Sequence, residues 1–550
     1  MKKIFFSLSF TGIAITTIAQ LTIDNAIFFL QPGATVTLQG NLTSNVDIQG
    51  TGLLQLKGTT LQNVDMGGNT IPNLELDNAA NATLLNTNTR IGSSLFFTNG
   101  KLQTGNLNLT LSPTASVTGA ISSRFVWTNG TGQLKKELIA DIASFELPVG
   151  ENTNYRPAYL TTSGSSYSSA NFGVRVIGTA DPSKPLMVPS YLNTHWPITK
   201  TGITSGTITL AGQYIDPSDV IGTEANLVGY YNNATDWSSV GETHNAATNI
   251  ISARVISDNG TLSGINKFLQ VGARAFLQGA YSPGTGLMTE NLRTLPFGSS
   301  ASTANFPSTD PYRVAPYSTT FIHINNPTVE AISGSGVMGA QPLTADNIVD
   351  WVYLELRNLN APPGNILQTR SALIQRDGDI VDMDGASPVT FNNQTNGSYL
   401  LAVRHRNHLG LGIDQTSPRS LNETKSTAFT TNVIDFRTAS DAQLHGTAVA
   451  YATAAHPVLS TVKLLWGGNA NSNNQTRANG PTSLNDYLFL LFLTLGNNPT
   501  LIIPNVYHSA DMNMDRSVRA NGPTSQNDYL LLLSTILGGN ATIIINQQLL

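Results

Sequence analysis

The chain has 550 residues, carries charge on only 11% of them, and has a formal net charge of -5. No block of Lys or Arg occurs, so nucleic-acid binding is not expected, because phosphate contacts need clustered cations. Cysteine is absent, which excludes a disulfide framework, a thiolate nucleophile and a cysteine-based zinc site. The abundance of Thr, Ser, Asn and Gly around short apolar runs is typical of strands and turns rather than long helices.

The N-terminus has the pattern of a secretory signal peptide. Two lysines precede an apolar run over residues 4–18, and Thr17 and Ala19 are small residues suited to a cleavage site before Gln20. A buried helix or a membrane anchor is the alternative. No later segment has the ~18 apolar residues that a membrane span needs. We therefore expect residues 1–19 to be removed and the protein to be secreted or displayed at the cell surface.

Residues 20–122 predict a β-solenoid. Short runs alternate apolar and polar residues, as in Ala34–Leu38, Leu53–Leu56 and Leu107–Leu111, and Gly or Asn separates them. Repeated short strands of this kind stack into a solenoid, which leaves few long edges. A small sandwich is the competing fold.

Longer strands follow, and the predicted fold class is mainly β. Residues 123–283 contain strands such as 171–176 and 227–231, which favour a β-sandwich. Residues 284–318 are rich in Ser, Pro, Thr and Gly, which predicts a linker. The remaining predicted parts are a second sandwich at 319–440, a connector at 441–460 and a duplicated C-terminal module at 461–550.

The duplication is the clearest pattern in the chain. Residues 477–483, RANGPTS, recur 42 residues later at 519–525, and Asn485-Asp486-Tyr487-Leu488 recurs as Asn527-Asp528-Tyr529-Leu530. In each copy a Leu-rich stretch follows and ends at a glycine, Gly496 or Gly538. Asn or Asp before such a stretch predicts a capped helix. Two small helices are therefore expected at the C-terminus.

The second copy predicts a calcium loop. Asp511, Asn513 and Asp515 alternate along the chain, and Ser517 stands where such loops offer a backbone carbonyl. Calcium needs six to eight oxygen ligands, so a further carboxylate is required, and Asp528 at the helix start is the candidate. Arg516 takes the place of the usual glycine. The alternative is a polar turn that caps the helix.

The first copy predicts a degenerate version of this loop. Its equivalent residues are Asn469, Asn471 and Asn473, with Asp486 as the distal group. Only one of these four residues has a carboxylate, and fewer charges lower the affinity for calcium. A structural copy without a cation is the alternative to a weak site.

These loop-and-helix units resemble the dockerin-type calcium repeats of secreted bacterial proteins. They resemble more closely a variant at the end of Gram-negative surface proteins of the haemagglutinin-like type. The resemblance rests on residues 511–515, the duplication and the NGPTSxND segments, and covers residues 461–550. It implies structural calcium, and dockerins themselves bind cohesin domains. Residues 350–352 through 404–408 also resemble a domain that precedes such repeats.

A second acidic cluster consists of Asp377, Asp379, Asp382 and Asp384. Four carboxylates this close repel one another unless a cation or water screens them. A calcium ion in a loop between strands and a solvated turn are both consistent with the pattern.

His405 and His408 are the remaining metal-binding candidates, but they lie on an expected strand end between arginines, and no HExxH motif occurs. A structural or surface role is therefore favoured over zinc. Nucleophile elbows, phosphate loops and dinucleotide fingerprints are also missing from the sequence.

The sequence therefore predicts a non-catalytic, calcium-dependent surface protein of adhesin or haemagglutinin type. Neutral strands rich in Asn, Thr and aromatic residues suit contacts with an extracellular polysaccharide or a surface protein. The rival interpretations are a dockerin-like scaffold and a polysaccharide-degrading enzyme, which would need paired carboxylates in the solenoid.

Overall fold

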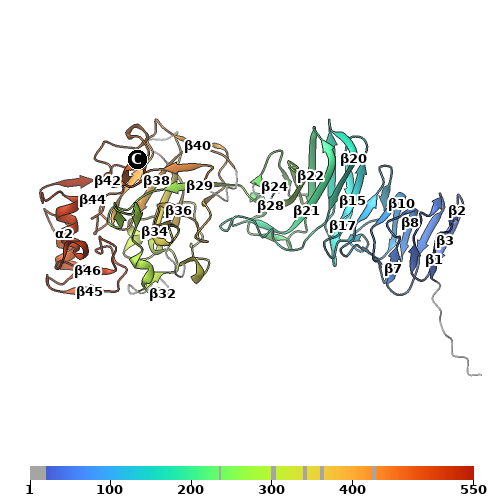
Figure 1. The fold of residues 1–550 in the computed structure, drawn as a ribbon, viewed down its shortest axis with the longest axis horizontal. Helices are drawn as coiled ribbons and strands as arrows, with labels where there is room; N and C mark the ends of the chain where they lie inside the picture. Colours follow the sequence, from blue (N-terminus) through green and yellow to red (C-terminus); the bar gives the residue numbers. More distant parts are fainter. Residues whose placement is uncertain are drawn as a thin grey trace, which may run out of the picture. The chain divides into compact units, whose positions relative to one another are not determined.

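The computed structural model describes residues 20–233, 237–298, 305–338, 344–359, 365–423 and 429–549 (Figure 1). The expected signal peptide, residues 1–19, lies outside the described residues. The protein is mainly β. Within the described ranges, no helix is long and apolar enough to cross a membrane. The chain divides into two compact units. Unit 1 consists of Met1–Pro182, Tyr191–Asn233 and Ser239–Gly264. Unit 2 consists of Ser183–Ser190, Ala234–Ser238 and Ile265–Leu550.

Unit 1 begins with the predicted β-solenoid. Parallel strands stack coil on coil, so that Leu54 pairs with Leu74 and Ile71 pairs with Ile91. The first ladder contains β1 (Leu21–Ile23), β4 (Leu42–Ser44), β7 (Gln62–Asp65), β9 (Ala82–Leu84), β11 (Leu102–Gln103), β14 (Val126–Trp127) and β17 (Val149–Glu151). The second contains β3 (Thr35–Leu38), β6 (Leu53–Leu56), β8 (Thr70–Asp77), β10 (Thr89–Asn99), β12 (Leu109–Leu111) and β15 (Leu134–Leu138).

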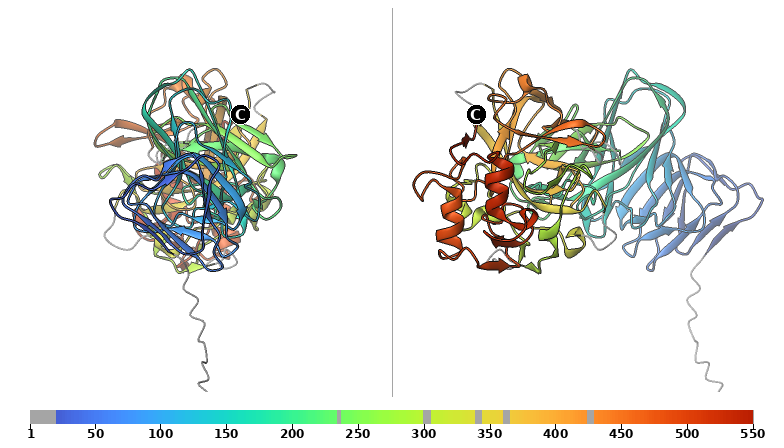
Figure 2. Two further views of the ribbon diagram at one scale, coloured as in Figure 1. Left: turned by 90° about the vertical axis from the view of Figure 1, so that its right-hand side faces the viewer. Right: turned by 60° about the vertical axis from the view of Figure 1, so that its left-hand side comes forward.

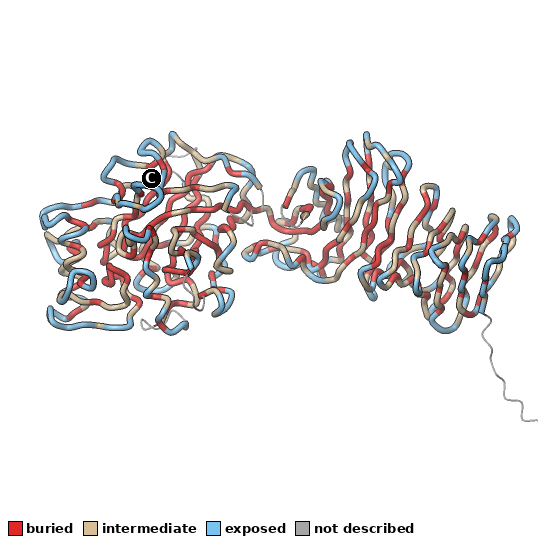
Figure 3. The backbone as a smooth tube through the Cα atoms, viewed as in Figure 1, coloured by how far each residue is buried: buried red, intermediate tan, exposed pale blue. Residues whose placement is uncertain are grey.

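The alternation of the sequence explains the solenoid. Leu54, Leu56, Leu109 and Leu111 are buried, while the residues between them are only partly covered. Buried and less buried stretches alternate along the chain (Figure 3). Asparagine occupies the turns because it tolerates the left-handed backbone, as at Asn81 with φ 75°. Its side chain also links successive coils. Asn41 Oδ1 accepts from Asn63 N at 2.9 Å, Asn81 Oδ1 from Lys101 N at 2.8 Å, and Asn88 Oδ1 from Asn108 N at 2.8 Å.

A buried lysine holds the last turn of the solenoid. Lys136 Nζ donates to the carbonyl oxygens of Ser112, Pro113 and Ala115 at 2.7, 3.0 and 2.8 Å. Burial lowers the pKa of Lys136 to about 8. The lysine therefore satisfies three main-chain acceptors of the preceding coil.

The solenoid continues into antiparallel sheets without a break at the predicted boundary of 122 and 123. Strand β15 pairs in parallel with β12 and antiparallel with β20, and β20 pairs with β21. Phe172, Trp196 and Leu210 lie in the same core as the solenoid leucines. The antiparallel strands include β20 (Ser166–Val174) and β21 (Tyr191–Thr204), and a second sheet of β16 (Phe145–Leu147), β19 (Ala158–Ser163), β22 (Thr207–Gln213), β27 (Ile250–Arg254) and β26 (Thr243–Asn245).

Unit 2 is built on a nine-stranded sheet. Its central strand β34 is buried at every residue, as expected for a strand covered on both faces. The strands are β37 (Val389–Asn392), β29 (Phe268–Arg274), β36 (Asp379–Val381), β35 (Ile366–Gln375), β34 (Ile348–Arg357), β38 (Gly397–His405) and β39 (His408–Gly412), with β40 (Arg419–Leu421) on β38 and β41 (Val433–Asp435) on β29.

The structure differs from the predicted linker at 284–318. Phe306, Tyr312 and Tyr317 are buried in the core of unit 2, and Tyr312 donates its hydroxyl to the carbonyl of Trp351 at 2.9 Å. Single aromatic residues anchor this Ser- and Pro-rich segment to the sheet, which composition alone did not reveal. Just before the segment lies β30 (Tyr281–Ser282). The segment itself contains β31 (Leu287–Met288), β32 (Phe297–Gly298), β33 (Phe306–Pro307) and the 3-10 turns Asn291–Thr294, Pro311–Arg313 and, at its end, Tyr317–Thr319.

The predicted connector, residues 441–460, contains a 3-10 turn, Asp441–Gln443, and the first strand of a hairpin. Strand β42 (Ala452–His456) pairs with β43 (Ser460–Leu464). Tyr451 and Val462 are buried in the core of unit 2, so this stretch is part of the folded unit.

The duplicated module, predicted at 461–550, ends unit 2, and its loops, helices and paired strands lie within residues 469–546. The α-helical turns α1 (Asp486–Leu488) and α2 (Asp528–Leu530) continue as the π-helical stretches Phe489–Thr494 and Leu531–Ile536 (Figure 2, right). The side chains of Asn485 and Asn527 cap the two helices, as the sequence predicted. Gly496 and Gly538 follow the helices with φ 59° and 57°, the left-handed conformation that ends a helix at glycine.

The two copies of the module exchange strands. Strand β44 (Gln475–Arg477) of the first loop pairs with β47 (Ile544–Asn546) after the second helix. Conversely, β46 (Ser517–Arg519) of the second loop pairs with β45 (Ile502–Pro504) after the first helix. The rings of Tyr487 and Tyr529 lie against each other with centroids 4.1 Å apart. Each copy thus completes its fold with a segment of the other.

Candidate cation site in the duplicated module

The second loop brings its predicted residues together. Asp511 and Asp528 are completely buried. Asp528 Oδ1 accepts from Met512 N at 2.7 Å and from Asn513 N at 3.3 Å, and Oδ2 accepts from Arg519 N at 2.9 Å. The NGPTSxND segment therefore loops out and returns Asp528 to the start of the loop, which accounts for the inserted residues.

The side chains of the loop fix its own backbone. Asp511 accepts from Asp515 N at 3.0 Å and from Arg516 N at 2.8 Å. Asn513 Oδ1 accepts from Asp515 N at 3.1 Å, and Asp515 Oδ1 accepts from Ser517 N at 2.9 Å. Arg516 has φ 67°, so the left-handed turn forms without the usual glycine. Ser517 begins β46.

The carboxylates of this loop are buried close to one another. Burial raises the pKa of Asp511 and of Asp528, the charge of Arg406 partly offsets this at Asp511, and the charge of Asp511 raises the pKa of Asp528 further. Burial also raises the pKa of Asp515. Arg519 Nη2 is 4.0 Å from Asp515 Oδ2, at the limit of an ion pair. Carboxylates that destabilise one another in a buried loop are stabilised when a divalent ion is bound among them.

The first loop has the same backbone with amides in place of carboxylates. Asn469 Oδ1 and Asn471 Oδ1 accept from Asn473 N at 3.0 and 3.2 Å. Asp486 accepts from Asn471 N at 3.3 Å and from Arg477 N at 2.9 Å, matching Asp528. Burial raises the pKa of Asp486. One buried carboxylate and three amides thus hold the backbone of the first loop, which has one acidic residue where the second loop has three.

The second acidic cluster is divided among separate partners. Asp379 pairs with Arg274 at 2.5 Å, and Asp382 pairs with Arg370 at 2.9 Å. Asp377 accepts from the Asp379 amide at 3.1 Å. Asp384 accepts the backbone amides of Ala386 and Ser387 at 3.0 and 2.9 Å. These contacts favour the interpretation as a structural turn.

His405 and His408 belong to a buried network. His405 Nε2 is 3.0 Å from Asp350 Oδ2, and the Nδ1 atoms of the two histidines are 3.0 Å apart. Tyr507 donates to Asp350 Oδ1 at 2.7 Å. Burial lowers the pKa of both histidines. Asp350 was not identified from the sequence, because a single acid inside an apolar strand gives no pattern.

Asp310, His323 and Glu330 also lie close together, and no spacing or motif in the sequence connects them. Asp310 Oδ2 is 2.9 Å from His323 Nε2 and 3.1 Å from Arg313 Nε. Glu330 pairs with Arg370 at 3.0 Å and with Arg313 at 3.2 Å. Two arginines in contact with two carboxylates balance the charge and disfavour a metal ion.

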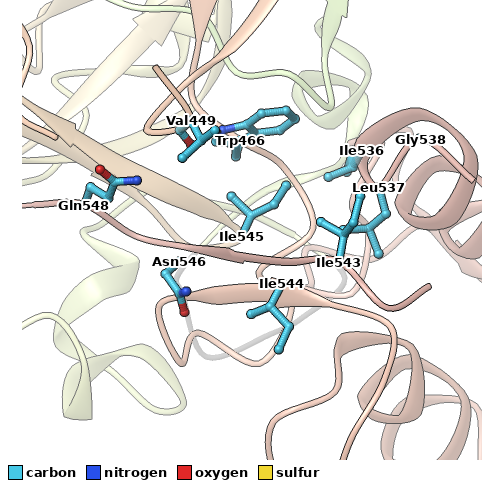
Figure 4. Close-up of a pocket in the computed structure, with 10 residues that line it drawn as sticks. All are labelled: Val449, Trp466, Ile536, Leu537, Gly538, Ile543, Ile544, Ile545, Asn546 and Gln548. Carbon is cyan, nitrogen blue, oxygen red and sulfur yellow. The ribbon is translucent and has the colours of Figure 1, made fainter. Parts of the chain in front are cut away.

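An apolar groove of about 410 Å³ lies beside the second helix (Figure 4). None of its lining residues is charged, and Trp466 Nε1 donates to the Val449 carbonyl at 3.0 Å. An apolar group fits this surface better than a charged one. The lining residues are Val449, Trp466, Ile536, Leu537, Gly538, Ile543, Ile544, Ile545, Asn546 and Gln548.

No family model, no curated protein and no solved structure matches this chain.

Proposed function

We propose that this chain is an exported, non-catalytic cell-surface protein of adhesin type whose duplicated module is ordered by calcium. The observation that carries the calcium part is the gathering of three acidic residues, Asp511, Asp515 and Asp528, around one tight loop, with two of them completely buried. Calcium is a hard cation that takes carboxylate, amide and carbonyl oxygens in flexible loops. Its role would be structural, since the loop cannot offset buried negative charge by apolar burial alone.

The adhesin part is supported by the solenoid and by the N-terminal pattern of export. Acidic residues of the solenoid are bound into the ladders, as in Asp77 with Lys57 at 2.8 Å and Glu137 with Arg90 at 2.7 Å. Such pairing favours a structural role for these carboxylates over acid–base chemistry. The polar, neutral turns suit an extracellular polysaccharide or a surface protein as partner. Binding of the secreted chain to immobilised polysaccharides, with and without chelator, tests this; hydrolysis of the polysaccharide would contradict it.

The calcium part is tested by calorimetric titration of the full secreted chain with calcium chloride. We expect saturable binding that is lost in Asp511→Ala and Asp515→Ala. The equivalent changes in the first loop, Asn469→Ala and Asn473→Ala, are the matched controls and should leave a binding event. Absence of saturable binding to the unmodified chain would contradict the proposal.

The apolar groove favours a second candidate, a docking role for the module. Ile544 lines the groove and is exposed, and Ile502 is the exposed equivalent in the first copy. If the groove receives an apolar side chain of a partner, Ile544→Asp should release the protein from the cell surface while Ile502→Asp should not. Equal surface attachment of both variants would contradict docking through this groove.

A further inference from the structure

The turn between β38 and β39 lies against both loops of the module. Its two residues, Arg406 and Asn407, are completely buried. The Asn407 carbonyl accepts from Asn469 N at 3.1 Å, and Asn407 Nδ2 donates to the Asp511 carbonyl at 2.8 Å. Asn469 and Asp511 are the first residues of the two loops, 42 positions apart. One asparagine of the nine-stranded sheet therefore contacts the same position in both copies.

The orientation of the Asn407 amide follows from its contacts. The Asp511 carbonyl can only accept a hydrogen bond, so the group of Asn407 that faces it is the Nδ2 donor. Gly279 N donates to His408 Nε2 at 3.0 Å, so the proton of the neutral His408 lies on Nδ1. Asn407 Oδ1 at 2.8 Å and His405 Nδ1 at 3.0 Å are both within reach of this proton.

The arginine beside it anchors the same turn. Arg406 pairs with Asp350 at 3.0 Å and donates to the carbonyl of His508. Its own carbonyl accepts from Ser472 Oγ at 2.9 Å. The backbone is also close at Gly279, where a Cβ atom would lie 2.0 Å from the Met512 carbonyl. The second loop therefore packs directly against the turn between β38 and β39 and against Gly279.

We propose that Asn407 is a positioning residue of the calcium site, although it lies outside both loops and more than a hundred residues from Asp511. By holding the Asp511 carbonyl, it fixes the backbone from which the first carboxylate of the site projects. Groups that orient metal ligands typically change metal affinity about 10–100-fold when removed. The inference rests on the proposed calcium function and names a residue that the loop pattern does not include.

The test compares Asn407→Ala with a matched control, Gln368→Ala, in the full secreted chain. Gln368 is also a buried amide of this sheet, which donates to the Asn325 carbonyl at 2.9 Å and accepts from Asn392 N at 2.7 Å. Neither of these contacts involves the module. Calcium affinity is measured by calorimetry, and the melting temperature is measured in calcium and in EDTA.

We expect Asn407→Ala to weaken calcium binding about 10–100-fold and to reduce the melting-temperature increase that calcium causes. Gln368→Ala should lower both melting temperatures equally and leave the affinity unchanged. Asn407→Asp, which keeps the volume and the acceptor for His408 but loses the donor, should behave like Asn407→Ala and provides a variant if alanine impairs folding. Wild-type affinity in both Asn407 variants would overturn the inference. Failure of the unmodified chain to bind calcium would instead overturn the proposed function, and the inference with it.

Discussion

The two aspartates that begin the helices allow a matched test of the calcium site. Asp486 and Asp528 occupy equivalent positions, are both completely buried, and both accept a backbone amide at 2.9 Å. Replacing either by Asn removes a charged acceptor, at a cost of about 1–3 kcal/mol. In EDTA both variants should lose stability, and Asp528→Asn should lose less than Asp486→Asn, because removal of its charge relieves repulsion with Asp511.

The two variants should differ in how much calcium raises their melting temperature. A ligand at 100 times its Kd stabilises the folded state by about 2.7 kcal/mol, which corresponds to roughly 4 °C in melting temperature for a unit of the size of unit 2. Asp486→Asn should keep this increase and Asp528→Asn should lose it. The assay is differential scanning calorimetry in EDTA and in saturating calcium. If both variants keep the increase, or both lose it, the assignment of the cation to the second loop is wrong.

Three further predictions concern pH, the buried lysine and the solenoid core. The raised pKa values of Asp511 and Asp528 mean that these two carboxyl groups bind more protons in the folded state than in the unfolded state above about pH 4. Their contribution to stability in EDTA should therefore fall as pH rises, and calcium should remove this loss in urea titrations. Lys136→Met leaves buried carbonyl oxygens without a donor and should lower the free energy of unfolding by about 1–3 kcal/mol. An unchanged free energy of unfolding would contradict this prediction. Leu74→Ala in the solenoid core should cost about 2–5 kcal/mol, whereas exposed Leu85→Ala should change urea stability by less than about 0.5 kcal/mol.

The solenoid could be predicted because its signal is local. Alternation within a few residues, as at Leu54 and Leu56, reports one buried face directly. The division of the chain into units could not be predicted in the same way. Strand β29 pairs with β37, β36 and β41, which follow it by more than a hundred residues, and no local pattern encodes that pairing. Likewise, Phe306 and Tyr312 anchor a segment whose average composition is that of a linker.

The residues of the candidate site could be predicted because a calcium loop needs a carboxylate beyond its alternating ligands, and Asp528 stands at the start of the next helix. The duplication then gave Asp486 as its equivalent in the first copy. The supporting residues had no such signal. Asp350, Arg406 and Asn407 come from strands and a turn of the sheet, and only the fold brings them to the loops. The acidic cluster near Asp382 illustrates the opposite case, in which residues adjacent in sequence have separate partners.

The strand exchange gives a physical reason why a cation bound at one charged loop would stabilise both copies of the module. A cation among Asp511, Asp515 and Asp528 would order β46, which pairs with β45 of the first copy. The second helix leads into β47, which pairs with β44 beside the first loop. Binding free energy at one loop would therefore stabilise both pairs of strands. The amide-built first loop can then keep its fold without the desolvation penalty of a second buried cluster of charges, and this explains how the two loops can share a backbone and differ in charge.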